Sequence, residues 1–234
     1  MKEIVIAGAC RTAQGKLGGA LRSFTNQELG SVLIRALLER SKVDPDAVDE
    51  VIMGCVGQQS DAHNVARVIS VMAGIPPRVP AYTVNRNCAS GMQALVSAAQ
   101  AILSGSAGLV IAGGVEVMSA VPFVNRDMRF GKKLRHSVMI DSLWEGLRDP
   151  LSGMMMGETA ELLAREFSLT RVEQDRYAME SHRRACAAAA GRFKDEIVPV
   201  CLPSRDRRLF DTDEGPLPST SIEVLSQLPS TFCE

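Results

Sequence analysis

Cys88 is the residue of this chain whose type and position best suit covalent chemistry. It follows the strand-like run 81–84 and precedes an alanine-rich helical stretch, so it is expected at a strand-to-helix turn. The unpaired N–H groups and the dipole of a helix N-terminus stabilise a thiolate, the nucleophilic form of cysteine. The position therefore suits a nucleophile that carries an acyl group as a thioester. A structural role is the alternative, because cysteine also packs as a small apolar side chain.

The other cysteines and the histidines give weaker signals. No two cysteines form a C-x-x-C pair, so neither a zinc ribbon nor a thioredoxin-type motif is indicated, and no metal site is predicted. Free cysteines without a visible secretory signal indicate a reducing compartment, the cytoplasm. No catalytic role is assigned to the remaining cysteines and histidines, which are Cys10, Cys55, Cys186, Cys201, Cys233, His63, His136 and His182. Of these, His182 is expected on the solvated surface of a helix.

The composition excludes several classes of function. The chain has 234 residues, with 26 basic against 27 acidic side chains and a net charge of −1. Proteins that bind nucleic acids or anionic membranes normally carry a basic excess, so neither partner is expected. Aromatic residues make up only 4% of the chain, which leaves little surface for stacking on single-stranded nucleic acid.

The first half alternates strand-like and helical segments. Apolar runs suited to strands occupy 3–7, 50–53, 81–84 and 109–111, and helical spacing lies between them at about 26–38, 64–73 and 88–103. Asn26 is the predicted N-cap of the first helix. This alternation predicts an α/β fold, a mostly parallel sheet with helices on both faces.

The second half is predicted to be helical and irregular. Residues 119–150 show no strand alternation, and the segment 125–135 is basic. Two helices are expected at 156–167 and 170–190. The second opens with a capping box of Thr170 and Glu173 and closes at Gly191. A boundary is placed near residue 119.

Segments spread along the chain resemble the thiolase family. Residues 84–94, VNRNCASGMQA, resemble the nucleophile signature V-N-x-x-C-x-S-G-x-x-A. The other similar segments follow in family order: Arg11-Thr12 with Gly15 and Gly19 (R-T-P-x-G, with Ala13 in place of proline), 63–76 (Q-N-x-A-R … A-G-I-P), 112–119 (A-G-G-x-E-x-M-S) and 156–161 (M-G-x-T-A-E).

The resemblance implies a thiolase-like layered fold and an acyltransferase. Residues 1–118 would form an incomplete N-terminal core, and 119–234 a loop domain for coenzyme A and oligomer contacts. The C-terminal half would be absent. The implied reaction, in fatty-acid metabolism, exchanges acyl groups between coenzyme A and acetyl-CoA or a 3-ketoacyl-CoA. Coenzyme A is then a substrate, no cofactor is permanently bound, and a homodimer or homotetramer is expected.

The resemblance also assigns roles to individual residues. Cys88 would take the acyl group, and Leu147 and Met156 would lie along the pantetheine arm. Clustered guanidinium groups suit phosphate oxygens, so Arg205, Arg207 and Arg208 are candidate partners of the coenzyme's phosphates. The basic segment 125–135 would match the loop that pairs dimers into tetramers. A solvated loop face is the alternative for both basic runs.

The chain departs from the family pattern at several places. Met155 stands where many biosynthetic members carry histidine, and Gly215-Pro216-Leu217 follows Asp213-Glu214 where an arginine is usual. The N-E-A-F, G-H-P and C-x-G-G-G motifs, which supply acid, base and oxyanion groups, do not occur. Two interpretations stay open: an acyltransferase of which this chain is a fragment, and an inactive half-thiolase that binds acyl-CoA or assembles with a partner chain. A ketoacyl synthase-type condensing enzyme is a further alternative, which Met118-Ser119 and Met156-Gly157 disfavour.

Overall fold

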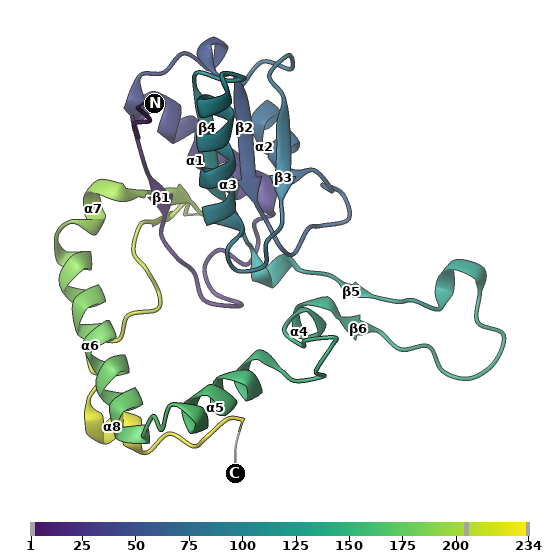
Figure 1. Cartoon of the computed structure of the whole chain (residues 1–234), viewed down its shortest axis with the longest axis vertical. Coiled ribbons are helices and arrows are strands. Elements are labelled where there is room, and N and C mark those ends of the chain that lie inside the picture. Colours follow the sequence, from purple (N-terminus) through teal and green to yellow (C-terminus); the bar gives the residue numbers. More distant parts are fainter. Residues whose placement is uncertain (1–2, 204–205, 233–234) are drawn as a thin grey trace. The chain divides into compact units, whose positions relative to one another are not determined.

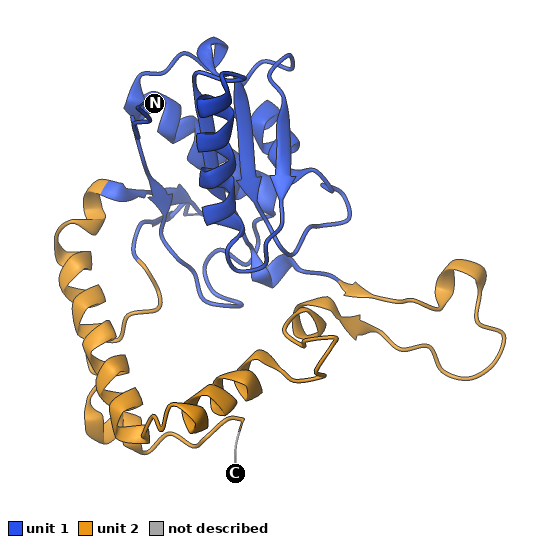
Figure 2. Cartoon of the chain, viewed as in Figure 1, with its two compact units in different colours: residues 1–122, 196–212 blue, residues 123–195, 213–234 orange. Residues whose placement is uncertain are grey.

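The computed structural model describes residues 3–203 and 206–232. The chain divides into two compact units, residues 1–122 with 196–212 and residues 123–195 with 213–234 (Figure 2). The predicted division, 1–118 and 119–234, differs from these units because residues 196–212 return to the first unit. There β7 (Ile197–Val198) pairs in parallel with β1 (Arg11–Thr12), and Val200 is buried in the core. The predicted role of 119–234 in coenzyme and oligomer contacts stays a prediction.

A three-stranded parallel sheet forms the centre of the first unit. Its order is β3 (Ala81–Val84), β2 (Glu50–Gly54), β4 (Val110–Gly114), and Val51 pairs with Ala81 on one side and Ile111 on the other. The predicted strands at 50–53, 81–84 and 109–111 are confirmed, with β4 extending through two glycines. A short hairpin of β8 (Val200–Cys201) and β9 (Leu209–Phe210) adds to this unit.

Helices cover both faces of this sheet, as the α/β prediction requires. Side chains alternate along β2, so Val51 and Met53 join the core beneath α1 (Asn26–Ser41) and α2 (Val65–Met72). Ile52 points to the other face and packs with Ala94 and Ala98 of α3 (Ser90–Ser104). Figure 1 shows α3 in front of the strands and α1 and α2 behind them. The remaining regular pieces of this unit are the 3-10 turns Pro45–Ala47 and Met118–Ala120.

The predicted strand at 3–7 is wrong, since residues 3–10 belong to no strand or helix. A strand needs a partner whose N–H and C=O groups complete the ladder. Within the described ranges no strand pairs with this run, and Val5 and Ile6 are 73% and 82% exposed.

The N-cap of the first helix lies one residue before the predicted cap, and the helix begins at Asn26 itself. Thr25 is the N-cap of α1: its Oγ1 accepts a hydrogen bond from the Glu28 N–H at 3.2 Å, and the Glu28 carboxylate accepts one from the Thr25 N–H at 2.9 Å. This reciprocal capping box satisfies two N–H groups at the helix start and outcompetes a cap at Asn26. The Asn26 side chain is thereby left for other partners and is fully buried.

Among its described residues, the second unit contains a hairpin, two longer helices and several short ones. β5 (Phe123–Val124) and β6 (Ile140–Asp141) pair antiparallel and enclose the basic loop, in which a 3-10 turn covers Met128–Phe130. The predicted helices are confirmed as α5 (Met156–Glu166) and α6 (Arg171–Ala190), and α6 has the expected Thr170–Glu173 capping box and ends at Gly191. The short helices α4 (Ser142–Gly146), α7 (Phe193–Glu196) and α8 (Ile222–Ser226) complete the described elements.

α8 packs beside α6 through a bridging arginine. Arg171 forms an ion pair with Asp175 at 2.9 Å and donates to the carbonyl oxygen of Leu228 at 2.9 Å.

Of the helices that the structure describes, none combines the length and the apolar composition needed to cross a membrane.

Candidate active site

Cys88 lies in the turn between β3 and α3, two residues before the helix begins, and is exposed. The turn is tight because Asn87 adopts a left-handed conformation, with φ 49°. The Ser90 hydroxyl stabilises this turn with two hydrogen bonds. The hydroxyl accepts from the Arg86 N–H at 2.8 Å and donates to the Asn87 carbonyl oxygen at 2.6 Å. The predicted strand-to-helix position of Cys88 is therefore confirmed, and its chemical role stays a prediction.

Two glycines at strand ends let the start of α3 approach the sheet. A Cβ on Gly54, the last residue of β2, would lie 2.4 Å from the carbonyl carbon of Ser90 and 2.5 Å from the nitrogen of Gly91. A Cβ on Gly114, the last residue of β4, would lie 3.4 Å from the Cα of Gly91. The turn that carries Cys88 thus rests on backbone at the carboxyl ends of two parallel strands.

The helix start favours an anion at this turn. The N-cap residue of α3 is Ala89, whose methyl group cannot cap the N–H groups of the first turn. Partial positive charge at a helix N-terminus stabilises a nearby thiolate. An exposed sulfur at this position can attack an electrophilic carbonyl that reaches it from solvent.

The segment that follows β4 connects the loops around this turn. The Val115 N–H donates to the Gly54 carbonyl oxygen at 3.0 Å, which extends the β2–β4 ladder. The Val117 N–H donates to Oδ1 of Asn26 at 2.7 Å, and Ser119 Oγ accepts from the Gly18 N–H at 2.9 Å. Neighbouring residues of one short segment therefore hold different parts of the first unit.

Glu116 holds three successive residues of the loop after β2. Its carboxylate accepts hydrogen bonds from the N–H groups of Val56 and Gly57, at 2.8 and 3.0 Å, and from the Cys55 thiol at 3.8 Å. Asn26 supports the same loop: its amide donates to Cys55 Sγ at 3.4 Å and to the Gly57 carbonyl oxygen at 3.2 Å. The sequence predicts Asn26 only as a helix N-cap, and it gives Glu116 no role beyond its place in the segment 112–119. The only local signal was the reciprocal Thr25–Glu28 cap, which leaves Asn26 inside the helix.

Cys55 is held as a neutral thiol. Burial, together with the adjacent Glu116 carboxylate, raises the pKa of Cys55 from 9.0 to about 12. Cys55 is 1% exposed and its thiol donates to Glu116, so it acts as a packing and hydrogen-bonding group. This agrees with the absence of a catalytic assignment for Cys55.

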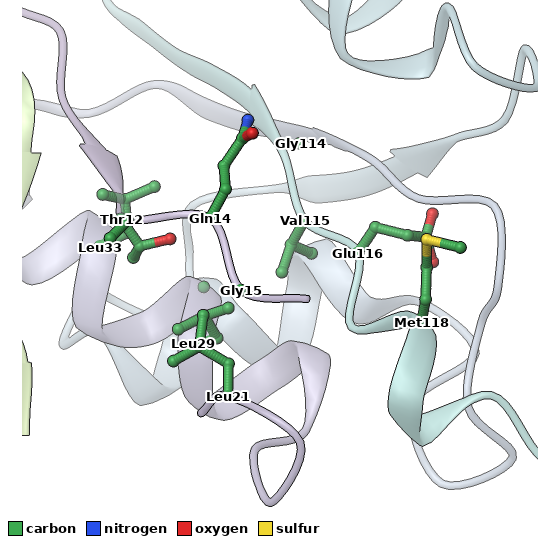
Figure 3. Close-up of a pocket in the computed structure, with 12 residues that line it drawn as sticks. Thr12, Gln14, Gly15, Leu21, Leu29, Leu33, Gly114, Val115, Glu116 and Met118 are labelled. Atoms are coloured by element: carbon green, nitrogen blue, oxygen red, sulfur yellow. The ribbon is translucent and has the colours of Figure 1, made fainter. Parts of the chain in front are cut away.

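A cavity of about 350 Å³ opens beside this network. It is lined by α1, the loop after β1 and the segment after β4, and Figure 3 shows Leu29 and Leu33 facing it from α1 and Glu116 and Met118 from the β4 side. Cys88 is not among the lining residues. The predicted nucleophile therefore lies outside this cavity.

The structure brings Leu147 and Met156 together in the second unit. The Met156 N–H donates to the Leu147 carbonyl oxygen at 2.9 Å, and an isolated bridge links Arg148 with Met155. Both side chains are partly exposed, at 38% and 48%, so apolar surface is open to a ligand. Met155, where many biosynthetic members carry histidine, is buried.

Two of the three predicted arginines, Arg207 and Arg208, lie in the first unit, between β8 and β9. Arg207 and Arg208 are exposed, and Arg207 adopts φ 45° while the Arg208 carbonyl oxygen accepts from the Leu202 N–H at 2.9 Å. Arg205 lies outside the described residues, as does Cys233. Phosphate binding by these guanidinium groups stays a prediction.

His182 differs from the solvated residue that was expected. It is half-buried on α6, and its Nδ1 accepts a hydrogen bond from the Leu217 N–H at 3.1 Å.

In the described ranges, no three His, Cys, Asp or Glu side chains are placed to hold a metal ion.

Comparison with known proteins identifies close relatives. Residues 4–234 match the family model for the thiolase N-terminal domain. The chain is 44% identical to an acetyl-CoA acetyltransferase of Pseudomonas aeruginosa and 47% identical to a probable acetyl-CoA acetyltransferase of Escherichia coli, each alignment covering 99% of this chain and 60% of the relative.

Solved structures give the same result. The acetyl-CoA acetyltransferase of Bacillus anthracis superposes with a TM-score of 0.95 at 41% identity, over 98% of this chain and 59% of that one. Human mitochondrial 3-ketoacyl-CoA thiolase in complex with CoA superposes with a TM-score of 0.92 at 39% identity, over 97% and 58%. The predicted layered α/β fold is confirmed. The chain spans about 60% of the length of the curated relatives it matches.

Proposed function

Because this chain belongs to the thiolase family, we propose that it takes part in acyl transfer between coenzyme A and acetyl-CoA or a 3-ketoacyl-CoA, with Cys88 as the nucleophile. The observation that carries this proposal is the exposed Cys88 sulfur at the N-terminus of α3, on a turn seated against Gly54 and Gly114.

The proposed first step is thioester exchange at Cys88. The thiolate attacks the thioester carbonyl of acetyl-CoA, a carbon–sulfur bond to Cys88 forms, and the bond to coenzyme A breaks with release of its thiolate. With a 3-ketoacyl-CoA, the thiolate attacks the 3-keto carbon and the bond between C2 and C3 breaks. The enolate of acetyl-CoA then leaves, and the shortened acyl group stays on Cys88. The reverse reactions return the acyl group to coenzyme A or to that enolate.

Binding of coenzyme A is assigned to two groups of residues. Leu147 and Met156 present adjoining apolar surface for the pantetheine arm, and Arg207 and Arg208, with Arg205, supply cations for the phosphates. A complex with CoA has been solved for the human relative, which supports coenzyme A as the substrate here. No permanently bound cofactor is part of the proposal. The proposed assembly is a homodimer or homotetramer. The proposed location is the cytoplasm, a reducing compartment, because the cysteines among the described residues form no disulfide.

Full turnover needs proton transfers beyond Cys88. In the described ranges, no histidine forms a hydrogen bond with the Cys88 thiol. The second candidate function is therefore an inactive half-thiolase that binds acyl-CoA or assembles with a partner chain. The departure at Met155 counts against acetoacetyl-CoA as the preferred substrate.

The test separates acylation from turnover. The purified chain is incubated with acetyl-CoA, and intact-mass and peptide mass spectrometry report whether an acetyl group appears on Cys88; Cys88→Ser is the control, and Cys201, also exposed, is the internal comparison. A thiolysis assay with acetoacetyl-CoA and coenzyme A follows on the same sample. Acetylation confined to Cys88 supports the nucleophile, and thiolysis in addition supports the enzyme. Equal acetylation of Cys88 and Cys201, or none, contradicts the assignment of Cys88.

A further inference from the structure

Glu116 belongs to the A-G-G-V-E-V-M-S segment, which has no part in the chemistry proposed so far. Its two carboxylate oxygens are occupied by the N–H groups of Val56 and Gly57 and by the Cys55 thiol. A carboxylate that accepts from all these donors is a charge-assisted anchor for the loop. Its role must therefore be sought in what the anchored loop supports.

The loop that Glu116 anchors, residues 55–57, directly follows Gly54, the residue that contacts the start of α3. Gly54, directly before the loop, contacts the backbone of Ser90 and Gly91, where a Cβ would have no room. The Cys55 N–H donates to the carbonyl oxygen of Val84 at 3.2 Å, and Val84 is the last residue of β3 before the turn. Both ends of the Cys88 turn thus touch the segment that Glu116 holds.

Gly57 allows the Glu116 carboxylate to approach this loop closely. A Cβ on Gly57 would lie 2.7 Å from Cγ2 of Val121 and 3.0 Å from Oε1 of Glu116. Glycine at this position lets the carboxylate reach the backbone N–H groups. A longer or shorter acid at 116 would not meet both donors from the same backbone position.

We propose that Glu116 is a positioning residue for Cys88: by clamping Cys55, Val56 and Gly57, it fixes the strand end against which the first turn of α3 is seated. The proposal rests on the proposed function only in treating Cys88 as the nucleophile. Glu116 acts through backbone geometry. Aspartate no longer reaches both N–H groups, and glutamine replaces one of the two accepting oxygens with an NH2 group, so either change breaks the clamp.

The experiment compares Glu116→Gln, which keeps length and loses charge, with Glu116→Asp, which keeps charge and loses reach. Ser119→Ala is the matched control, because it removes a side-chain bond that the same segment makes to a different loop, at Gly18. Two rates are measured in each variant: alkylation of Cys88 by iodoacetamide, relative to Cys201 in the same chain, and acetylation of Cys88 by acetyl-CoA over a range of concentrations.

Both Glu116 variants are expected to lower the maximal acetylation rate by about tenfold, because small displacements of reacting groups cost rate steeply. The acetyl-CoA concentration at half-maximal rate should change by less than about twofold, since the proposed coenzyme contacts are elsewhere. The alkylation ratio of Cys88 to Cys201 should fall by about threefold as the sulfur leaves its alignment with the helix N-terminus. Ser119→Ala should leave all three values unchanged.

Hydrogen exchange provides a direct readout of the clamp. The Val56 and Gly57 amides should exchange faster in both Glu116 variants and at the wild-type rate in Ser119→Ala. Where Glu116→Gln does not fold, Glu116→Asp carries the comparison. An unchanged Cys88 rate, a wild-type rate in Glu116→Asp, or an equal effect of Ser119→Ala overturns the proposal. If wild-type Cys88 is not acetylated at all, the proposed function fails, and the alkylation ratio still tests the positioning role.

Discussion

The backbone of Ser90 lies so close to Gly54 that a Cβ on the glycine would stand 2.4 Å from the Ser90 carbonyl carbon. Non-bonded carbon atoms do not approach each other this closely, so a side chain at residue 54 would push α3 away. The contact between Gly54 and Ser90 therefore sets the distance between the start of α3 and the end of β2. Cys88 precedes Ser90 by two positions and shares its turn. The exposure and orientation of the sulfur therefore depend on a residue that has no side chain.

Replacement of Gly54 by alanine is expected to lower the free energy of unfolding by about 2 kcal/mol or more, because backbone must move to admit the methyl group. Gly91→Ala is the matched control: a Cβ there meets no heavy atom within 4 Å, and alanine in a helix gains up to about 1 kcal/mol over glycine. Urea unfolding measures both. A Gly54→Ala variant as stable as the wild type would show that α3 is not seated as described.

The strands and helices of both units were predictable wherever their cause is local. The runs 50–53 and 81–84 are bounded by turns and match β2 and β3, and the Thr170–Glu173 box fixes the start of α6. The run 3–7 is also apolar and rich in β-branched residues, but it forms no strand. Strand pairing depends on a partner that is far away in the sequence. β4 shows the converse: its ladder with β2 carries Gly113 and Gly114, which have low strand propensity.

The nucleophile candidate was predictable and its support was not. Cys88 is identified by its neighbours in sequence, since a strand, a turn and a helix follow one another around it. Asn26 and Glu116 act over separations of 91 residues, to Val117, and 60 residues, to Val56. No local pattern encodes such contacts, and Asn26 even has the composition of a helix cap, the role first assigned to it.

Asn26→Ala is expected to destabilise the chain by about 1–3 kcal/mol, because it leaves the Val117 N–H without its buried acceptor and the Gly57 carbonyl oxygen without its donor. Gln27→Ala, next to it, removes a hydrogen bond to Asp61 at the surface and should change stability by less than about 0.5 kcal/mol. Chemical denaturation of the two variants decides between them. Equal effects would mean that the buried amide contributes only helix propensity.

Cys55 predicts a loss of stability at alkaline pH. Its pKa is 9.0 ordinarily and about 12 in the folded chain, so between these values the unfolded chain gives up a proton that the folded chain keeps. The contribution of the neutral thiol is complete below pH 9 and falls as the pH rises toward 12, by at most about 1.4 kcal/mol per pH unit. Cys55→Ala, which has no proton to lose, should flatten this decline. Unfolding free energies at several alkaline pH values measure it, and parallel slopes in the two proteins would contradict it.

Met156→Glu tests the proposed pantetheine surface, where the Met156 N–H is bonded to the Leu147 carbonyl oxygen. The substitution keeps this backbone bond and places a charge on surface proposed to receive an apolar arm. The loss of about 1–2 kcal/mol of apolar contact predicts a dissociation constant for coenzyme A raised by about 5- to 30-fold. Leu151→Glu is the matched control, since Leu151 is 95% exposed in the same unit and has no proposed contact. Isothermal titration with coenzyme A gives both constants. The same weakening in both variants would reflect repulsion between the added carboxylate and the coenzyme's phosphates, and the assignment of Met156 would then be wrong.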